Sequence, residues 1–159
     1  MPERDQALRD HLLKLLSTGS AHLGLDEALE NMPAELRGKK APGIAHSIWQ
    51  LVEHLRIAQE DILEFSRRGD YVSPAFPEGY WPEAEAPPSE EAWDQSVEAI
   101  HRDLQAMKDL VADPRTDLYA KLPWGTGQTV LREAMLVADH NAYHLGQIVT
   151  VRQALGAWG

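Results

Sequence analysis

The sequence predicts an all-α protein, an antiparallel four-helix bundle with one short extra helix, and three observations support this fold class. Apolar residues recur every three or four positions in four long stretches, which is the spacing of a helix with one buried face. No stretch alternates apolar and polar residues over the length of a strand. The 159 residues are enough for one domain with a substantial core. We therefore expect residues 1–159 to form a single domain of packed helices.

The first long helix is predicted between Arg4 and Leu16, and the polar segment 17–20 ends it. Its apolar positions are Leu8, Leu12, Leu15 and Leu16. A short amphipathic helix is expected next, before Pro33. Its apolar positions are Leu25, Ala28, Leu29 and Met32. His11 and His22 have no neighbour at metal-ligand spacing, and we expect both at the surface.

The second long helix begins at a clear start signal, because Ser47 is followed three residues later by Gln50 in a capping box. Its apolar stripe is Ile48, Leu51, Leu55, Ala58, Ile62 and Phe65. His54 projects about 60–70° from the centre of this stripe at 100° per residue. The stripe predicts a core-facing helix with a histidine at the rim of the core.

The segment 67–88 interrupts the helical pattern with five prolines: Pro74, Pro77, Pro82, Pro87 and Pro88. It also contains the aromatic residues Tyr71, Phe76, Tyr80 and Trp81, whose apolar area favours an ordered loop. A loop this long in a compact domain is usually functional or disordered. Two interpretations are open: a lid or wall over a pocket, and a packed crossover between helices.

The third long helix starts at Ser89, with Glu90 and Glu91 in its first turn, where negative charge suits the helix dipole. Its stripe is Trp93, Val97, Ile100, Leu104, Met107 and Val111. An extended connector follows over 116–127. The fourth long helix is predicted to start between Thr126 and Thr129 and to run to about Leu155.

His140 and His144 stand four residues apart on this last helix. Residues i and i+4 lie one above the other, with Cβ atoms roughly 5–6 Å apart, so both rings can approach one ion. His144 falls in the apolar stripe, and a buried polar ring costs about 1–3 kcal/mol unless it finds a partner. A shared ion is such a partner, and His54 on a packed helix would supply a third imidazole.

Composition limits the other chemistry and the partners. The formal net charge of −10 disfavours nucleic acid and membrane surfaces as partners. Because the chain has no cysteine, a metal must bind to histidine, carboxylate or water. A cysteine nucleophile and a disulfide are excluded for the same reason. No basic leader and no long apolar run is present, so we expect a cytoplasmic protein.

The sequence resembles the DinB/YfiT-like superfamily of bacterial four-helix proteins described as metal-dependent enzymes. The resemblance rests on four segments: 47–59, 139–147, the loop motif 76–82 and the closing residues 155–158. The family takes one metal-binding histidine from the second long helix and two, four apart, from the last. These map onto His54, His140 and His144, which the helical projection also selects.

The same resemblance implies zinc or nickel as the divalent ion and a low-molecular-weight thiol as substrate, such as bacillithiol, mycothiol or glutathione. It implies a thiol transferase or a related hydrolase or isomerase, and it suggests a homodimer. It points to the site more strongly than to the reaction.

Three neutral imidazoles leave a divalent ion with open positions, which suits activation of water or a thiol, or polarisation of a carbonyl. Glu133, Asp61 and Gln147 are candidates to orient the imidazoles, and the two carboxylates are also candidate general bases. A zincin-type protease is disfavoured because Asn141 stands where the His-Glu-x-x-His motif has its glutamate.

Two functions from different classes follow from the sequence. The first is a metal-dependent enzyme acting on a small molecule. The second is a non-catalytic metal-binding module, in which the ion ties helices together and the surface binds a ligand or partner. The enzyme is favoured because a purely structural site is more often closed by a fourth protein ligand.

Overall fold

The computed structural model describes residues 3–17 and 21–158, and its regular secondary structure there is all-helical. The α-helices are α1 (Glu3–Leu16), α2 (Leu25–Leu29), α3 (Ile48–Arg67), α4 (Glu90–Ala112) and α5 (Val130–Ala154). Two 3₁₀ turns, η1 (Ala34–Leu36) and η2 (Glu78–Tyr80), lie in the connections. No helix in these ranges has the length and apolar character that a membrane crossing requires.

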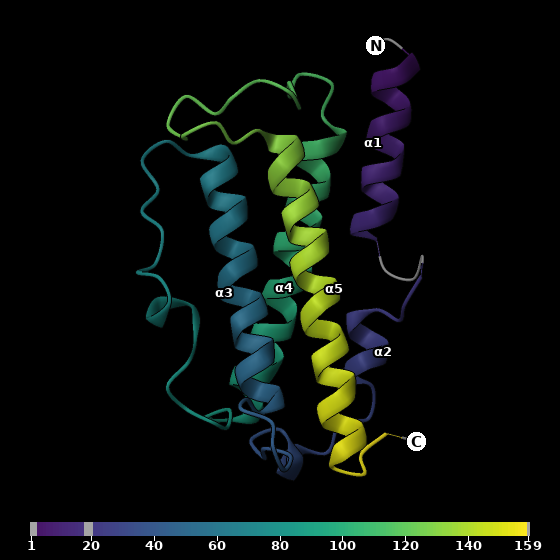
Figure 1. Cartoon of the computed structure of the whole chain (residues 1–159), viewed down its shortest axis with the longest axis vertical. Helices are drawn as coiled ribbons and strands as arrows, with labels where there is room; N and C mark the ends of the chain where they lie inside the picture. The colour runs from purple at the N-terminus through teal and green to yellow at the C-terminus, as the bar shows by residue number, and fades with distance from the viewer. Residues whose placement is uncertain (1–2, 18–20, 159) are drawn as a thin grey trace.

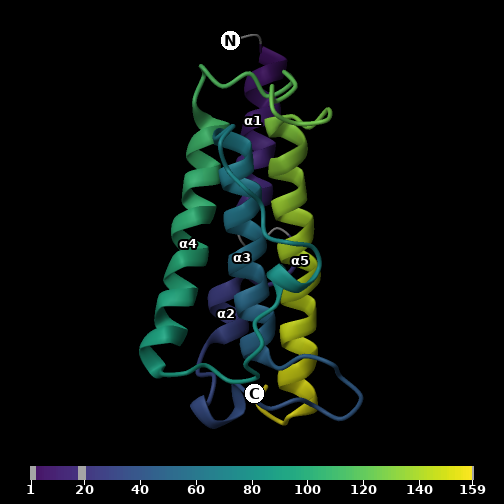
Figure 2. The same ribbon diagram turned by 90° about the vertical axis from the view of Figure 1, so that its left-hand side faces the viewer.

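The long helices lie side by side, with α3 packed against both α4 and α5, and α1 packed against the same two helices (Figure 1). The short α2 packs on α5. Figures 1 and 2 show that α3 and α4 run in the same direction, while α1 and α5 run in the opposite one. This parallel pair departs from the antiparallel order that the sequence predicts, because the connection 68–89 is long enough to return along α3 before α4 begins (Figure 2).

Side chains at the predicted positions cap the helices. The Ser47 side chain accepts a hydrogen bond from the Gln50 amide, and the Gln50 side chain accepts one from the Ser47 amide, which confirms the capping box. Ser89 and Thr129 cap α4 and α5 in the same way through their hydroxyl oxygens. These caps fix the residue at which each helix begins, and so the face on which each histidine emerges.

The short helix α2 ends at Leu29, earlier than the apolar pattern suggests. Asn31 adopts a positive φ of 52°, a left-handed conformation that an α-helix cannot continue through. Met32 nevertheless remains buried, at 6% exposure. The apolar pattern therefore predicts the buried face of this segment correctly, but its prediction of the end of α2 is wrong.

Two apolar clusters fill the interior. One cluster lies between α2, the N-terminal half of α3 and the C-terminal half of α5. The other lies between α1 and the remaining halves of α3 and α5. Leu55 and Leu145, each the sequence neighbour of a candidate ligand, are buried in the first cluster. This packing fixes α3 against α5 at the level of the histidines.

Candidate metal centre

The three histidines selected from the sequence lie together where α3 faces α5. One ring nitrogen from each of His54, His140 and His144 lies within 4.8 Å of the others. The Nε2 atoms of His140 and His54 are 3.0 Å apart. Two nitrogens bound to one tetrahedral ion at about 2.0–2.1 Å lie roughly 3.3–3.4 Å from each other. The rings therefore stand close to the separation that a shared ion requires.

Hydrogen bonds on the far side of two rings set their tautomers. His54 Nδ1 lies 2.8 Å from the carbonyl oxygen of Tyr80, and His144 Nδ1 lies 2.7 Å from Oε1 of Gln147. Both partners are acceptors, so each Nδ1 carries the proton and donates it. The Nε2 lone pairs of His54 and His144 are then free for an ion, which is the usual arrangement around a metal-binding histidine.

The third ring, His140, has no such support. Its Nδ1 is buried and has no hydrogen-bond partner among the described residues. A bound ion engages only one nitrogen of a ring, so an ion bound to Nε2 of His140 would leave this Nδ1 unpaired. His140 is therefore the least well oriented of the three rings.

All three imidazoles are neutral at pH 7. Burial is the main cause that lowers the pKa of His140 to about 4 and of His144 to about 4, and the neighbouring imidazoles lower both further. Burial also lowers the pKa of His54, and the hydrogen bond to Tyr80 opposes this shift. A divalent cation binds neutral imidazole, so the site holds its donors in the form that a metal needs.

An aromatic stack covers one side of the cluster. The Trp81 indole stacks on His54 with ring centroids 3.9 Å apart, and His46 stacks against Trp81 at the same distance. The loop 68–89 thus forms a wall of the site. Tyr80 holds this wall in place, since its hydroxyl donates a 2.7 Å hydrogen bond to Asp61 on α3.

A groove of about 580 Å³ lies near the cluster, although none of the three clustered histidines is among the described residues that line it. His46, Tyr143 and Gln147 are among its walls. Gln147 bonds His144, and the Tyr143 ring lies 4.9 Å from the His144 ring. The described residues that line this groove include no lysine, arginine, aspartate or glutamate. The walls of this groove are therefore uncharged and combine apolar and polar side chains.

The two carboxylates expected near the histidines have other hydrogen-bond partners. Asp61 accepts from Tyr80, and this carboxylate contributes, after burial, to raising the pKa of that phenol. Glu133 is buried at 2% exposure and pairs with Arg132 at 2.7 Å. No hydrogen bond to one of the three imidazoles is found for either carboxylate in the described structure. Gln147 does contact a ring, as its place beside His144 suggests.

Sequence reasoning did not find Trp81, Tyr80 or His46 as parts of the site. Trp81 and Tyr80 could be noted only as loop aromatics, because their distance from His54 depends on how the loop folds back. His46 precedes α3 and has no ligand-spaced partner, so nothing local marks it.

The donor set fits a divalent ion such as zinc or nickel. Three neutral nitrogen donors converge, and two of them are oriented by hydrogen bonds. Three imidazoles are a common donor set for such an ion.

Comparison with known proteins identifies the family of the chain. The family model described as the DinB superfamily matches residues 6–148, a span that includes all three of them. No curated protein and no solved structure matches the chain significantly. Because the family match covers most of the chain, this protein belongs to the DinB superfamily.

Proposed function

We propose that this protein is a metal-dependent enzyme that transfers a low-molecular-weight thiol or carries out a related hydrolysis. The observation that carries the proposal is the convergence of three neutral imidazoles, on His54, His140 and His144. A divalent ion held there would supply a nucleophile at neutral pH by lowering the pKa of water or of a thiol.

The residues of the chain have distinct roles in this proposal. His54, His140 and His144 hold the ion, while the Tyr80 carbonyl and Gln147 orient two of the rings. Trp81 covers the face of His54 and keeps water from that side. The groove beside Tyr143 and Gln147 admits the substrate, and its lack of charged walls favours a substrate whose reacting end is uncharged apart from the thiol.

Asp61 and Glu133 have different roles in the proposal. Asp61 acts through Tyr80 as a positioning residue for the loop that carries Trp81. Glu133, buried and paired with Arg132, is the weaker candidate for a general base because a buried, paired carboxylate has little access to substrate.

A bundle of four long helices is the scaffold of this proposal, supported by the contacts among α1, α3, α4 and α5. A homodimer and a cytoplasmic location remain predictions from the sequence and from the resemblance.

One observation favours the second candidate, a non-catalytic metal-binding module. The loop is already tied to His54 by the Tyr80 carbonyl and by Trp81. An ion shared with His140 and His144 would therefore connect α3, α5 and the loop, and its main effect would be stability.

The test compares turnover with stability. Protein purified without an affinity tag is analysed for its metal and loaded with zinc or nickel. It is assayed with bacillithiol, mycothiol and glutathione against monochlorobimane, and for hydrolysis with the ester 4-nitrophenyl acetate. We expect thiol-dependent turnover that His140→Ala abolishes and that His11→Ala leaves unchanged, because His11 is exposed on α1. Metal-dependent melting without turnover on any thiol or ester would reject the enzyme and support the module.

A further inference from the structure

One face of α5 lines the groove of about 580 Å³ near the histidine cluster, and it includes a glycine. Gly146 lies inside this helix, where glycine is less favourable than alanine. A Cβ atom at Gly146 would meet nothing within 4 Å outside its sequence neighbours and the backbone of its own helix. Packing therefore does not require a glycine there. The missing side chain instead leaves the groove open down to the backbone of α5, between Tyr143 and Thr150.

Hydrogen bonds along this face set the direction of the Tyr143 hydroxyl. When Nε2 of His144 binds an ion, its Nδ1 carries the proton and donates to Oε1 of Gln147. The amide nitrogen of Gln147 then faces Tyr143 and donates to Oη at 3.3 Å. Because Oη accepts this bond, its own proton points elsewhere, and no acceptor for that proton is found among the described residues. Tyr143 is 64% exposed, so it offers an accessible donor at the groove.

The other polar walls of the groove carry no charge. Thr150 donates its hydroxyl proton to the carbonyl oxygen of Gly146 at 2.8 Å. Burial, and then the Lys40 ammonium, lower the pKa of His46, so this imidazole is neutral at pH 7. No lysine or arginine is among the described residues that line the groove, and the chain has a net charge of −10. A carboxylate there would meet repulsion without a cation to bind it, whereas an uncharged oxygen acceptor would not.

The groove and the metal centre are close enough for one ligand to occupy both. The ring centroids of Tyr143 and His144 are 4.9 Å apart. An ion bound to Nε2 at about 2.0–2.1 Å stands about 3 Å from the centre of the His144 imidazole. It therefore lies within about 8 Å of the centre of the Tyr143 ring. A molecule bound to the ion through a thiol can extend a short tail to the Tyr143 hydroxyl.

From these features we propose that the groove binds the uncharged tail of the thiol substrate, and that the Tyr143 hydroxyl donates a hydrogen bond to a carbonyl oxygen in that tail. The inference rests on the proposed function, because the thiol itself binds the ion. It adds the class of the tail, which is neutral, carries an amide or a similar acceptor, and lies across Gly146. Tyr143 is thus a residue that determines specificity and has no part in holding the ion.

Three thiols of the same chain length test the class of the tail. N-acetylcysteamine carries an amide carbonyl, 4-mercaptobutyrate a carboxylate, and 1-pentanethiol only a hydrocarbon chain. Cobalt(II) is loaded into the full chain in place of zinc, because a thiolate bound to cobalt absorbs in the near ultraviolet. Each titration gives an affinity, which is corrected for the pKa of the free thiol. We expect N-acetylcysteamine to bind more tightly than 4-mercaptobutyrate, and equal or tighter binding of 4-mercaptobutyrate would overturn the uncharged class.

The variant Tyr143→Phe tests the hydrogen bond. It should weaken N-acetylcysteamine about 3- to 10-fold, the value of one hydrogen bond, and leave 1-pentanethiol unchanged. A disturbed metal site would weaken both thiols alike, so 1-pentanethiol is the control for the site itself. Equal changes for the two thiols, or no change for either, would overturn the role of Tyr143.

Failure of the inference is distinct from failure of the proposed function. If none of the three thiols produces the thiolate absorption with the cobalt-loaded wild type, the proposed thiol reaction and this inference are both rejected. If the thiols bind and Tyr143→Phe binds them as the wild type does, the inference alone is rejected.

The variant Gly146→Leu tests whether the tail lies in the groove. It fills the open space above α5 and should weaken N-acetylcysteamine and 1-pentanethiol about 10-fold or more. Ala154→Leu, at an exposed position of the same helix outside the groove, should bind both thiols as the wild type does. Equal affinities of Gly146→Leu and Ala154→Leu would overturn the placement of the tail.

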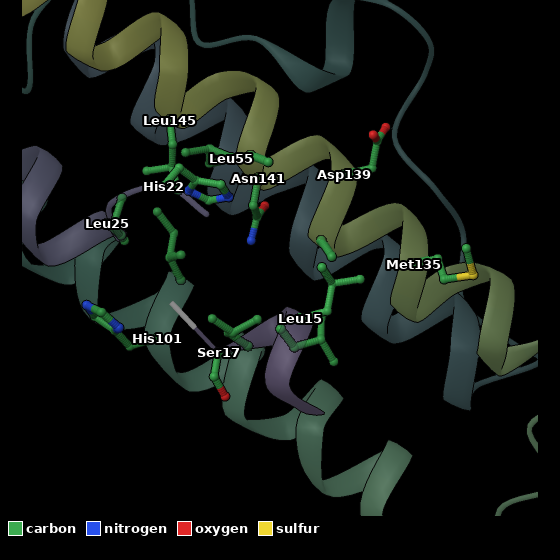
Figure 3. Close-up of a pocket in the computed structure, with 15 residues that line it drawn as sticks. Leu15, Ser17, His22, Leu25, Leu55, His101, Met135, Asp139, Asn141 and Leu145 are labelled. Atoms are coloured by element: carbon green, nitrogen blue, oxygen red, sulfur yellow. The ribbon is translucent and has the colours of Figure 1, made fainter. Parts of the chain in front are cut away.

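A cavity on a different face of α5 is the alternative location for the tail. It has a volume of about 380 Å³ and lies between α1, α2, α4 and α5 (Figure 3). Ala142→Phe places a ring in this cavity and should leave the affinity for both thiols unchanged. Loss of thiol binding in Ala142→Phe but not in Gly146→Leu would place the tail there and overturn the proposal. Circular dichroism identifies any variant that fails to fold, and the remaining variants then decide the result.

Discussion

The indole of Trp81 lies flat on the imidazole of His54, with ring centroids 3.9 Å apart and an angle of 0° between the planes. Trp81 comes from the loop and His54 from α3, so this contact joins a connecting segment to a candidate metal ligand. Stacked aromatic pairs contribute about 0.5–1.5 kcal/mol beyond the area that they bury. The stack, together with the Tyr80 carbonyl bonded to Nδ1, leaves the His54 ring little freedom to rotate.

Replacing Trp81 should therefore weaken metal binding without removing a ligand. We expect Trp81→Ala to lower the affinity for zinc about 10- to 100-fold, the range seen when groups that orient metal-binding histidines are lost. Trp81→Phe keeps a stacking ring and should recover most of the affinity. Titration calorimetry measures both.

Val72→Ala is the matched control, because Val72 lies in the same loop but is 85% exposed. Its zinc affinity should equal that of the wild type. If Trp81→Ala also binds zinc as the wild type does, the stack has no role in orienting His54.

Gln147 makes a similar prediction for the second oriented ring. Gln147→Leu removes the acceptor for the His144 Nδ1 proton and should reduce zinc affinity about 10- to 100-fold. Gln147→Glu keeps an oxygen acceptor and should restore it. Gln153→Leu, exposed on the same helix, serves as the control and should bind zinc normally. Equal affinities of Gln147→Leu and Gln153→Leu would contradict the assigned role.

The metal-free protein should lose stability as the pH falls. The pKa of His140 and of His144 is lowered from 6.5 to about 4 in the folded protein, mainly by burial. In the unfolded chain both return to about 6.5, so between these values the unfolded state binds more protons. The contribution of these two histidines to the free energy of unfolding is therefore fully present above about pH 6.5. It decreases between pH 6.5 and pH 4, and below pH 4 these groups cause no further loss.

Urea unfolding in the presence of a chelator, at intervals between about pH 4 and pH 7.5, measures this slope. The double variant His140→Ala, His144→Ala should have a flatter dependence, since it retains only the background from carboxylates and the other histidines. Parallel loss of stability in the wild type and the double variant would show that these two rings do not cause the slope.

Much of the site could be predicted because its signals are local. Spacing of four residues places His140 and His144 on one face of a helix, and the Ser47 capping box fixes where α3 begins and hence where His54 points. These signals depend only on helix geometry, which is the same in every protein.

The remainder depends on contacts between distant segments. Nothing within the loop sequence fixes Trp81 on His54 or the Tyr80 hydroxyl on Asp61, because both contacts require the loop to return along α3. The same return makes α4 parallel to α3, which helix periodicity cannot reveal. Asp61 and Glu133 illustrate the limit, since projection places a carboxylate on a face but does not identify its partner.

Arg9 is a buried residue that periodicity would place in solvent, and it provides the last prediction. It is 3% exposed, and its guanidinium donates to the carbonyl oxygens of Val111, Asp113 and Thr116 at the end of α4. Asp113 and Thr116 follow the end of α4, and the Asp113 carbonyl also accepts a hydrogen bond from the Thr116 amide. Arg9→Leu should therefore lower the free energy of unfolding by about 2–4 kcal/mol, because it removes the donors to the buried Val111 carbonyl and to the partly buried Thr116 carbonyl.

Urea unfolding with linear extrapolation checks this value. Arg9→Lys should recover only part of it, since an ammonium group cannot match the fixed fork of donors that reaches three carbonyls. Arg4→Leu, at an exposed position five residues earlier on α1, should stay within about 0.5 kcal/mol of the wild type. An Arg9→Leu variant as stable as Arg4→Leu would mean that water satisfies the end of α4, and that α1 is held to α4 by its apolar face alone.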